Sequence, residues 1–303
     1  LHAATGRMVK LAPRYLYSIE DIENTYSNVR HHISTKEIIL RHSTNTSDIR
    51  SAAIEGLDLS GAKHVLDLGC GYGFFIEALE GRLHDDALIT GIDIIDYQNR
   101  EIFLFTAGSI GYEGEFIHGS SDIIKSMNEN IFDLVISSYS LYFFPHLIPA
   151  IARILVPGGV FISLTHSRDT LKEVLQMIPL CIADAGIEPP KTIRIKKLFS
   201  EFCQENGASL LEPYFDRVET IEFANSLLFK DIHLDDCIYY LDQKKNLLFK
   251  EVLSNHIDSA PRVIDNFYSR LMNEASIERM LTLTKNDAIF RAYHFGKIGR
   301  TST

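Results

Sequence analysis

The sequence predicts an α/β protein with a doubly wound sheet of seven strands, and three observations lead to this prediction. Short apolar segments alternate with helical segments between residues 63 and 164, as is typical of a parallel sheet covered by helices on both faces. A glycine-rich turn follows the first apolar segment. Near the C-terminus, residues 214–223 and 288–295 predict an antiparallel pair that closes the sheet. This fold class is Rossmann-like, with an antiparallel last strand and a helical lid.

The segment before the sheet, residues 18–57, is expected to be helical. Ser18 and Asp21 form a variant of the capping box, which marks the start of a helix. A second short helix is expected near residues 35–42, and Ser47 begins a third after a polar break.

The alternating region then supplies the remaining elements in chain order. The expected strands are residues 63–68, 87–92, 115–118, 132–137, 160–164, 214–223 and 288–295. The expected helices are residues 74–81, 99–108, 122–127, 147–155, 171–185 and 195–206, with residues 226–280 largely helical.

This order of elements predicts four segments. Residues 1–45 form an N-terminal helical lid, residues 46–225 the α/β core, residues 226–285 an inserted helical lid, and residues 286–303 the closing strand and tail. Both lids are expected over the carboxyl edge of the strands, which carries the ligand in open α/β sheets.

Composition narrows the class of protein further. The 303 residues carry a formal net charge of −10, which disfavours nucleic acid and anionic membranes as partners. No apolar run is long enough for a transmembrane helix, and the first ten residues lack the pattern of a signal peptide. The four cysteines have neither disulfide nor metal spacing. We therefore expect a reduced, cytoplasmic protein without a metal, whose oligomeric state is left open.

The glycine-rich turn, Asp67 to Gly73, is the first candidate binding element. Gly69, Gly71 and Gly73 let the backbone turn sharply and approach a ligand closely, with Cys70 between them. Dinucleotide sites use a similar turn, but Asp67 would repel a pyrophosphate. A carboxylate at this position suits a ligand with a cationic amino group.

Polar residues after the next three strands complete a nucleoside-type site. Asp93 ends the second strand, where a carboxylate can accept both ribose hydroxyls, and Asp96 is a nearby alternative. After the third strand, a polar side chain can read an adenine amino group while Ile123 packs on the ring. The fourth strand ends near Ser137, and Tyr139 and Tyr142 are expected at the mouth of the site.

Together these motifs resemble the class I S-adenosylmethionine (SAM)-dependent methyltransferase superfamily, in particular its small-molecule enzymes. The resemblance runs from about Asp58 to Leu164 and includes the D-x-G-x-G-x-G turn and Asp93. It also includes the F-D-L-V strand, residues 132–135, and the L-x-P-G-G-x-F turn, residues 155–161. Each motif alone has low specificity, but their order and spacing together are highly specific.

The resemblance implies SAM as the cofactor and assigns roles to matching positions. Asp67 and the glycine turn would surround the methionine end, Asp93 would hold the ribose with Ile94 beside the adenine, and the stretch from Ser137 to Tyr139, with Ser138 between them, would meet the amino acid part. The family often has an acidic residue directly after the glycine of the third strand, whereas Ser120 follows Gly119 here. The adenine contact is therefore left open among Ser121, Asp122 and Ile123.

Methyl transfer can require a general base, and two histidines are placed for that role. His166 follows the fifth strand and His146 lies in the loop after the fourth strand. Tyr26, His42 and Tyr142 are expected to contact a small-molecule acceptor.

Three alternatives compete with a methyltransferase for small molecules. A non-catalytic SAM-binding regulatory protein would keep the glycine turn and Asp93. An NAD-dependent oxidoreductase shares both features, but Asp67, Gly73 and the Pro-Gly-Gly turn argue against it. A protein or RNA methyltransferase is disfavoured by the acidic charge and the absence of an Asn-Pro-Pro-Tyr-like element after the fourth strand.

Overall fold

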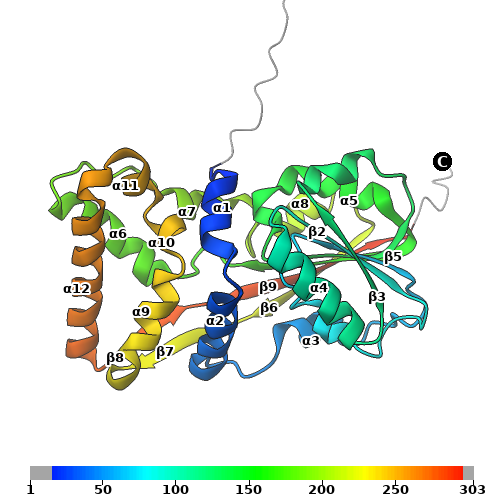
Figure 1. Ribbon diagram of the computed structural model, residues 1–303, viewed down its shortest axis with the longest axis horizontal. Coiled ribbons are helices and arrows are strands. Elements are labelled where there is room, and N and C mark those ends of the chain that lie inside the picture. The colour runs from blue at the N-terminus through cyan, green and yellow to red at the C-terminus, as the bar shows by residue number, and fades with distance from the viewer. Residues whose placement is uncertain (1–15, 296–303) are drawn as a thin grey trace, which may run out of the picture.

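A computed structural model describes residues 16–295 and contains a seven-stranded sheet of order β3-β2-β1-β4-β5-β9-β6 (Figure 1). Strand β9 runs antiparallel to both of its neighbours, and β1 to β5 pair in parallel. The predicted fold class and its seven strands are confirmed. The strands are β1 (His64–Leu68), β2 (Leu88–Asp93), β3 (Glu113–His118), β4 (Phe132–Ser138), β5 (Leu155–His166), β6 (Arg217–Phe223) and β9 (Asp287–His294).

Helices pack on the sheet where the alternation predicts them, with two exceptions. Helix α3 (Ile49–Ile54) packs on β9, α4 (Tyr97–Ser109) on β2 and β3, and α5 (Ile148–Ile154) on β5. The helices predicted at 74–81 and 122–127 are wrong, because these segments form only the 3₁₀ turns η1 (Ile76–Leu79) and η2 (Ser121–Ser126). In the first segment, the Arg50 side chain donates a hydrogen bond to the Phe74 carbonyl, which would accept the first backbone hydrogen bond of an α-helix here.

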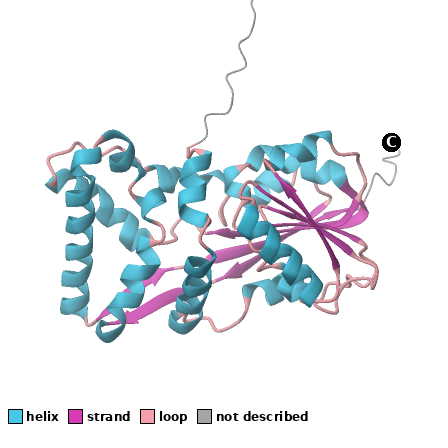
Figure 2. Cartoon of the chain, viewed as in Figure 1, coloured by secondary structure: helices cyan, strands magenta, loops and turns pink. Residues whose placement is uncertain are grey.

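The segment between β6 and β9 is an insertion carried on a two-stranded ribbon. Strands β7 (Ser226–Lys230) and β8 (Met280–Thr284) pair with each other and continue the β6–β9 hairpin away from the sheet (Figure 2). The sequence pattern does not predict either strand, because each is short and its partner lies about fifty residues away in the chain. The ribbon carries helices α9 (Leu234–Asp242), α10 (Lys245–Leu248), α11 (Lys250–Asn255) and α12 (Ala260–Glu278).

Helices from other parts of the chain join these inserted helices in one layer. Helix α6 (Lys172–Asp184) packs on α12, and α7 (Arg194–Glu201) packs on α10. The single helix predicted at 195–206 is wrong: the Cys203 amide donates to the Asn206 side chain, and a separate helix, α8 (Gly207–Leu211), follows. The helical layer stands beside the sheet in Figure 1.

The N-terminal helices lie between the sheet and this helical layer (Figure 1). Helix α1 (Ile19–Tyr26) packs on α10, and its predicted capping box between Ser18 and Asp21 is present. Helix α2 (Val29–His42) packs on β7 and α9. Within residues 16–295 no helix has the length and apolar character needed to cross a membrane. The predictions for residues 1–10 and for the tail after residue 295 lie outside the described residues.

Candidate functional site

The carboxyl edge of the sheet, α1, α2, α7 and the inserted helices enclose a cavity of about 1040 Å³. Its wall includes most of the site residues that the sequence predicts, namely Tyr26, Asp67, Gly69, Cys70, Gly71, Asp93, Ile94, Ser121, Asp122, Ser138, Tyr139, Tyr142, His146 and His166. Gly73, Ile123, Ser137 and His42 do not line it. The cavity therefore joins residues from the two predicted lids and the core.

The glycine turn after β1 brings bare backbone to the cavity. Gly69 has a φ of +68°, and a Cβ there would lie 2.6 Å from the Cβ of Ser140. Gly71 has a φ of +51°, and a Cβ at this position would meet no atom within 4 Å, so its backbone faces open space. The first glycine allows tight packing of two loops, and the second leaves room for a ligand.

Asp93 ties the glycine turn to the end of β2. Its Oδ2 accepts from the Gly71 amide at 2.8 Å, and its Oδ1 accepts from the Ile95 amide at 2.9 Å and from Asn99 at 3.3 Å. Burial raises the pKa of this carboxyl group. A carboxylate has about four acceptor sites, so these three bonds leave capacity for a ligand hydroxyl group in the cavity.

Asp67 is a buried carboxyl group that lacks a counter-charge. It is 1% exposed, and its Oδ1 has no hydrogen-bond partner among residues 16–295. Burial, and then the charge of Asp93, raises its pKa to about 8. A cationic ligand group placed here would satisfy the orphaned oxygen and favour the ionised form. The Asp67 carboxyl group therefore fits the ammonium group of an amino acid moiety as its hydrogen-bond acceptor.

The residues expected to contact the adenine come from the segments that follow β2 and β3. Ile94, Ser121 and Asp122 line the cavity, whereas Ile123 is 39% exposed and does not line it. The Asp122 carboxylate pairs with Lys125 and with His146 Nε2 at 3.0 Å, and the hydrogen bond from Lys125 leads the causes that lower its pKa to about 2. His146 thus lies at the same part of the cavity wall as Asp122.

Two predicted contacts from the core have structural roles instead. Ser137 is fully buried, and its Oγ lies 2.7 Å from that of Ser140, which in turn donates to the Leu68 carbonyl. Ser137 therefore stabilises the glycine turn indirectly, through Ser140. Gly73 packs against Phe103, since a Cβ there would lie 3.1 Å from that ring.

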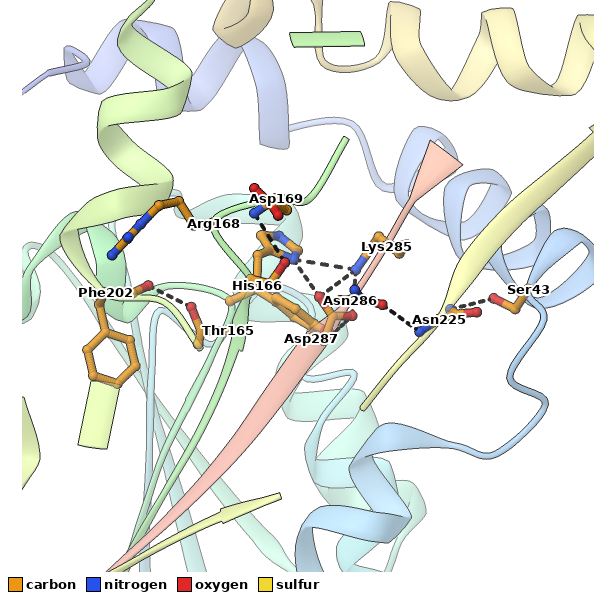
Figure 3. A network of polar contacts seen from close by, with 12 residues as sticks. Ser43, Thr165, His166, Arg168, Asp169, Phe202, Asn225, Lys285, Asn286 and Asp287 are labelled. Carbon is orange, nitrogen blue, oxygen red and sulfur yellow. Dashed lines mark hydrogen bonds and ion pairs between the residues drawn. The ribbon is translucent and has the colours of Figure 1, made fainter. Parts of the chain in front are cut away.

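A second polar cluster lies at the other end of the cavity, where β5 and β9 meet. Asp287 accepts from His166 Nδ1 at 2.7 Å, from the Tyr139 hydroxyl at 2.8 Å and from Lys285 Nζ at 2.6 Å. Figure 3 shows His166, Lys285 and Asp287 joined by these contacts. Tyr139 reaches Asp287 from a backbone with a φ of +54°, a conformation that β4 and the cluster must stabilise.

The charges in this cluster fix the protonation of His166. Burial opposes ionisation of Asp287, but Lys285 and His166 outweigh it and keep the pKa of this carboxyl group below its ordinary value. Burial, and then Lys285, lowers the pKa of His166. A neutral imidazole must donate from Nδ1 to the carboxylate, because two acceptors would repel each other at 2.7 Å. The Nε2 lone pair then remains available as a base.

The N-terminal helices close over the glycine turn through aromatic side chains. The Tyr72 hydroxyl donates to the Tyr26 carbonyl at 3.0 Å, and the ring of His32 stacks on Tyr26 with centroids 5.6 Å apart. Burial, and then the neighbouring Tyr26, raises the pKa of Tyr142. Burial lowers the pKa of His32 to about 4, so this ring is neutral. Tyr26 therefore connects Tyr72 of the glycine turn with Tyr142.

His42 does not lie at the mouth of the site, where the sequence predicts it. It is 7% exposed, with Nδ1 3.0 Å from the Leu228 carbonyl and Nε2 2.8 Å from Asp236. These contacts fasten α2 to β7 and α9, two elements that the sequence does not reveal as its neighbours.

Sequence reasoning missed the partners of His166. Asp287 directly precedes the predicted closing strand, residues 288–295, and Lys285 lies two positions before Asp287. The insertion adds Tyr240 and Lys244 to the same cavity wall. One signal was available for Asp287: an antiparallel strand begins at the edge where parallel strands end. The polar residues before residue 288 therefore had to lie beside His166.

Comparisons with known proteins match the core of this chain. Residues 66–163 match a family model described as a methyltransferase domain. A mitochondrial arginine-hydroxylase, NDUFAF5 of Danio rerio, is 30% identical over 112 residues, which cover 36% of this chain and 32% of that protein.

Solved structures of similar shape have low sequence identity. YcgJ from Bacillus subtilis is 12% identical, with a TM-score of 0.49 over 88% of this chain and 100% of that one. A SAM-dependent methyltransferase from Thiobacillus denitrificans, in complex with S-adenosylhomocysteine, is 18% identical, with a TM-score of 0.46 over 89% of this chain and 97% of that one.

The family match covers the glycine turn and Asp93, which both line the cavity. The part of this chain that builds this wall of the cavity therefore matches a methyltransferase domain.

Proposed function

We propose that this protein transfers the methyl group of SAM to a small-molecule acceptor. One observation supports the proposal: a single cavity has the glycine turn with the carboxyl groups of Asp67 and Asp93 at one end and an oriented, neutral histidine at the other. The order β2-β1-β4-β5 puts Asp93 and His166 three strand spacings apart, or about 14 Å. That separation leaves room for a cofactor and an acceptor side by side.

The cofactor end has a separate residue for each part of SAM. Asp93 is proposed to accept the ribose hydroxyls, and Asp67 the ammonium group. Ile94, with Ser121 and Asp122 beyond it, would border the adenine. The open backbone at Gly71 would admit the methionine part beside Ser138 and Tyr139. SAM supplies a methyl group that its sulfonium activates for in-line displacement.

The acceptor end supplies orientation and a base. His166 Nε2 is proposed to take the proton of the acceptor atom as that atom attacks the methyl group. Asp287 holds the imidazole in the required tautomer and stabilises the imidazolium that results. The two lids would exclude water and align donor with acceptor, which supplies much of the rate enhancement in such displacements.

The enclosure of the cavity supports a small acceptor rather than a macromolecule. Helices α1 and α2 lie over the glycine turn, and α7 and α10 pack on each other beside it. Apolar side chains of α7, including Leu198 and Phe199, line the acceptor end. An acceptor of metabolite size with an apolar body fits such walls.

Calorimetric titration with SAM, S-adenosylhomocysteine and NAD tests this proposal first. We expect both SAM ligands to bind and NAD not to bind. Transfer of a labelled methyl group to metabolite fractions would then identify an acceptor. Binding without transfer to any fraction would favour the non-catalytic alternative, and binding of NAD alone would contradict the proposal outright.

A further inference from the structure

Lys244, between α9 and α10, is a basic residue in the cavity wall that has no acidic partner among the described residues. Its Nζ lies 3.9 Å from the centroid of the Tyr240 ring. No carboxylate among residues 16–295 forms a salt bridge or hydrogen bond with it. The adjacent Lys245 differs in this respect, since its Nζ pairs with Asp242 at 3.1 Å.

The interactions of Lys244 place it at the acceptor end. Its charge contributes to lowering the pKa of both His166 and His32, and the charge of Lys285 acts on it in turn. Asp93 and Asp67 of the cofactor end are not among the groups that shift its own pKa.

The acceptor end therefore has a basic group without a counter-charge among the described residues. Lys285 and Asp287 neutralise each other, with Nζ and Oδ2 2.6 Å apart, and the low pKa values leave His166 and His32 neutral. Lys244 remains as an amine whose ammonium form has no opposite charge beside it within residues 16–295. That form is costly unless a partner supplies an opposite charge.

We propose that the acceptor bears an anionic oxygen group, a carboxylate or a phosphate, which pairs with Lys244 and directs the methyl-accepting atom towards His166. This inference rests on the proposed function, since it names the substrate class of the same cavity. The apolar side chains of α7 would hold the body of the acceptor. The Gln243 side chain, also in the cavity wall, is placed to donate a second hydrogen bond to the anion.

Binding of matched probes to the protein saturated with S-adenosylhomocysteine tests this. The library pairs carboxylic acids of varied size with their primary amides, and adds aryl phosphates and arylalkylamines. We expect at least one acid or phosphate to bind about tenfold more tightly than its neutral counterpart. Lys244→Met and Lys244→Gln should remove this preference, and Lys245→Met should keep it.

The acids and phosphates are separate arms, and the tighter class identifies the anion. If no probe shows an anion preference that depends on Lys244, or if the amines bind best, the proposal is wrong. Thermal unfolding of both Lys244 variants checks that the fold is intact. If Lys244→Met and Lys244→Gln give the same result, a packing effect of either new side chain is excluded as its cause.

Proton uptake provides a second readout. Burial, and then Lys285, lowers the pKa of Lys244 to about 7 in the free protein, so the amine is largely neutral at pH 8. A bound anion would raise this pKa, and calorimetry in buffers of different ionisation heat should detect uptake of up to one proton. Lys244→Met should abolish it. The other titratable groups that interact with this amine are Tyr240, Lys285, His166 and His32.

The affinity for S-adenosylhomocysteine separates this proposal from the proposed function. We expect Lys244→Met to leave that affinity within about twofold. A loss of tenfold or more would assign Lys244 to the carboxylate of the cofactor and overturn the inference. Conversely, acid binding that depends on Lys244 in a protein that transfers no methyl group would refute the proposed function and leave the anion site standing.

Discussion

The Nδ1 atom of His166 lies 2.7 Å from Oδ1 of Asp287, although 121 positions separate the two residues. His166 ends β5 and Asp287 begins β9, and the antiparallel register pairs them directly. The sheet itself therefore sets this distance, since both residues are held by ladder hydrogen bonds. A loop-borne partner would leave the imidazole freer to rotate.

Replacing His166 with Ala should lower the rate of methyl transfer by about a hundredfold to ten-thousandfold, because the acceptor would lose its general base. Labelled SAM and an acceptor from the acid library provide the assay, and added imidazole should restore part of the rate. His84→Ala is the matched control, since His84 does not line the cavity. An unchanged rate in His166→Ala would remove this residue from the mechanism.

Replacing Asp93 with Ala should weaken SAM binding by about 1–3 kcal/mol through loss of charge-assisted hydrogen bonds. This corresponds to roughly a five- to 150-fold rise in the dissociation constant, which calorimetry can measure. Asp96→Ala should have little effect, because Asp96 does not line the cavity and pairs with Arg100 at 2.8 Å. Equal affinities in the wild type and a folded Asp93→Ala variant would refute the ribose assignment.

Asp67 should make both stability and cofactor binding depend on pH. Folding raises its pKa from about 3.8 to about 8, so the folded state favours the protonated form. Its contribution to stability is fully present below pH 3.8 and is lost as pH rises through 8. Asp67→Asn should therefore raise the melting temperature of the ligand-free protein at pH 8.

Cofactor binding should show the opposite trend at the same residue. An ammonium ligand prefers the ionised carboxylate, so affinity for S-adenosylhomocysteine should increase up to about tenfold per pH unit between pH 6 and 7.5. Asp67→Asn should bind weakly with a flat pH profile. A wild-type profile that is also flat would show that Asp67 is already ionised in the free protein.

Arg291 should be important for stability, independently of the reaction. It is buried on β9 and donates to the carbonyls of Ala52, Ala53 and Glu55 at 2.8–2.9 Å, which satisfies the end of α3. Arg291→Met should lower the free energy of unfolding by about 3 kcal/mol, because it leaves buried carbonyls without donors. Denaturant unfolding measures this. Arg217→Met, at an exposed site, should change it by less than about 0.5 kcal/mol.

The core could be predicted from the sequence because its signals are local. The apolar runs, the glycine turn and Asp93 each mark one strand end, and parallel strands bring such ends to one edge. Ser137 was placed at the correct strand end but faces inward to Ser140, because a carboxyl-edge position does not specify which face of the sheet a side chain takes.

The fold class and the chain order of the core strands follow from the sequence alone, since residues within a few positions of each other encode these features. The surroundings of His166 depend on tertiary contacts instead. The β5–β9 register pairs Asp287 with His166, and the β7–β8 ribbon carries the inserted segment that brings Lys244 to the same cavity, so both pair segments far apart in the chain. Periodicity records which face of an element is buried, but it carries no information about which distant element covers that face.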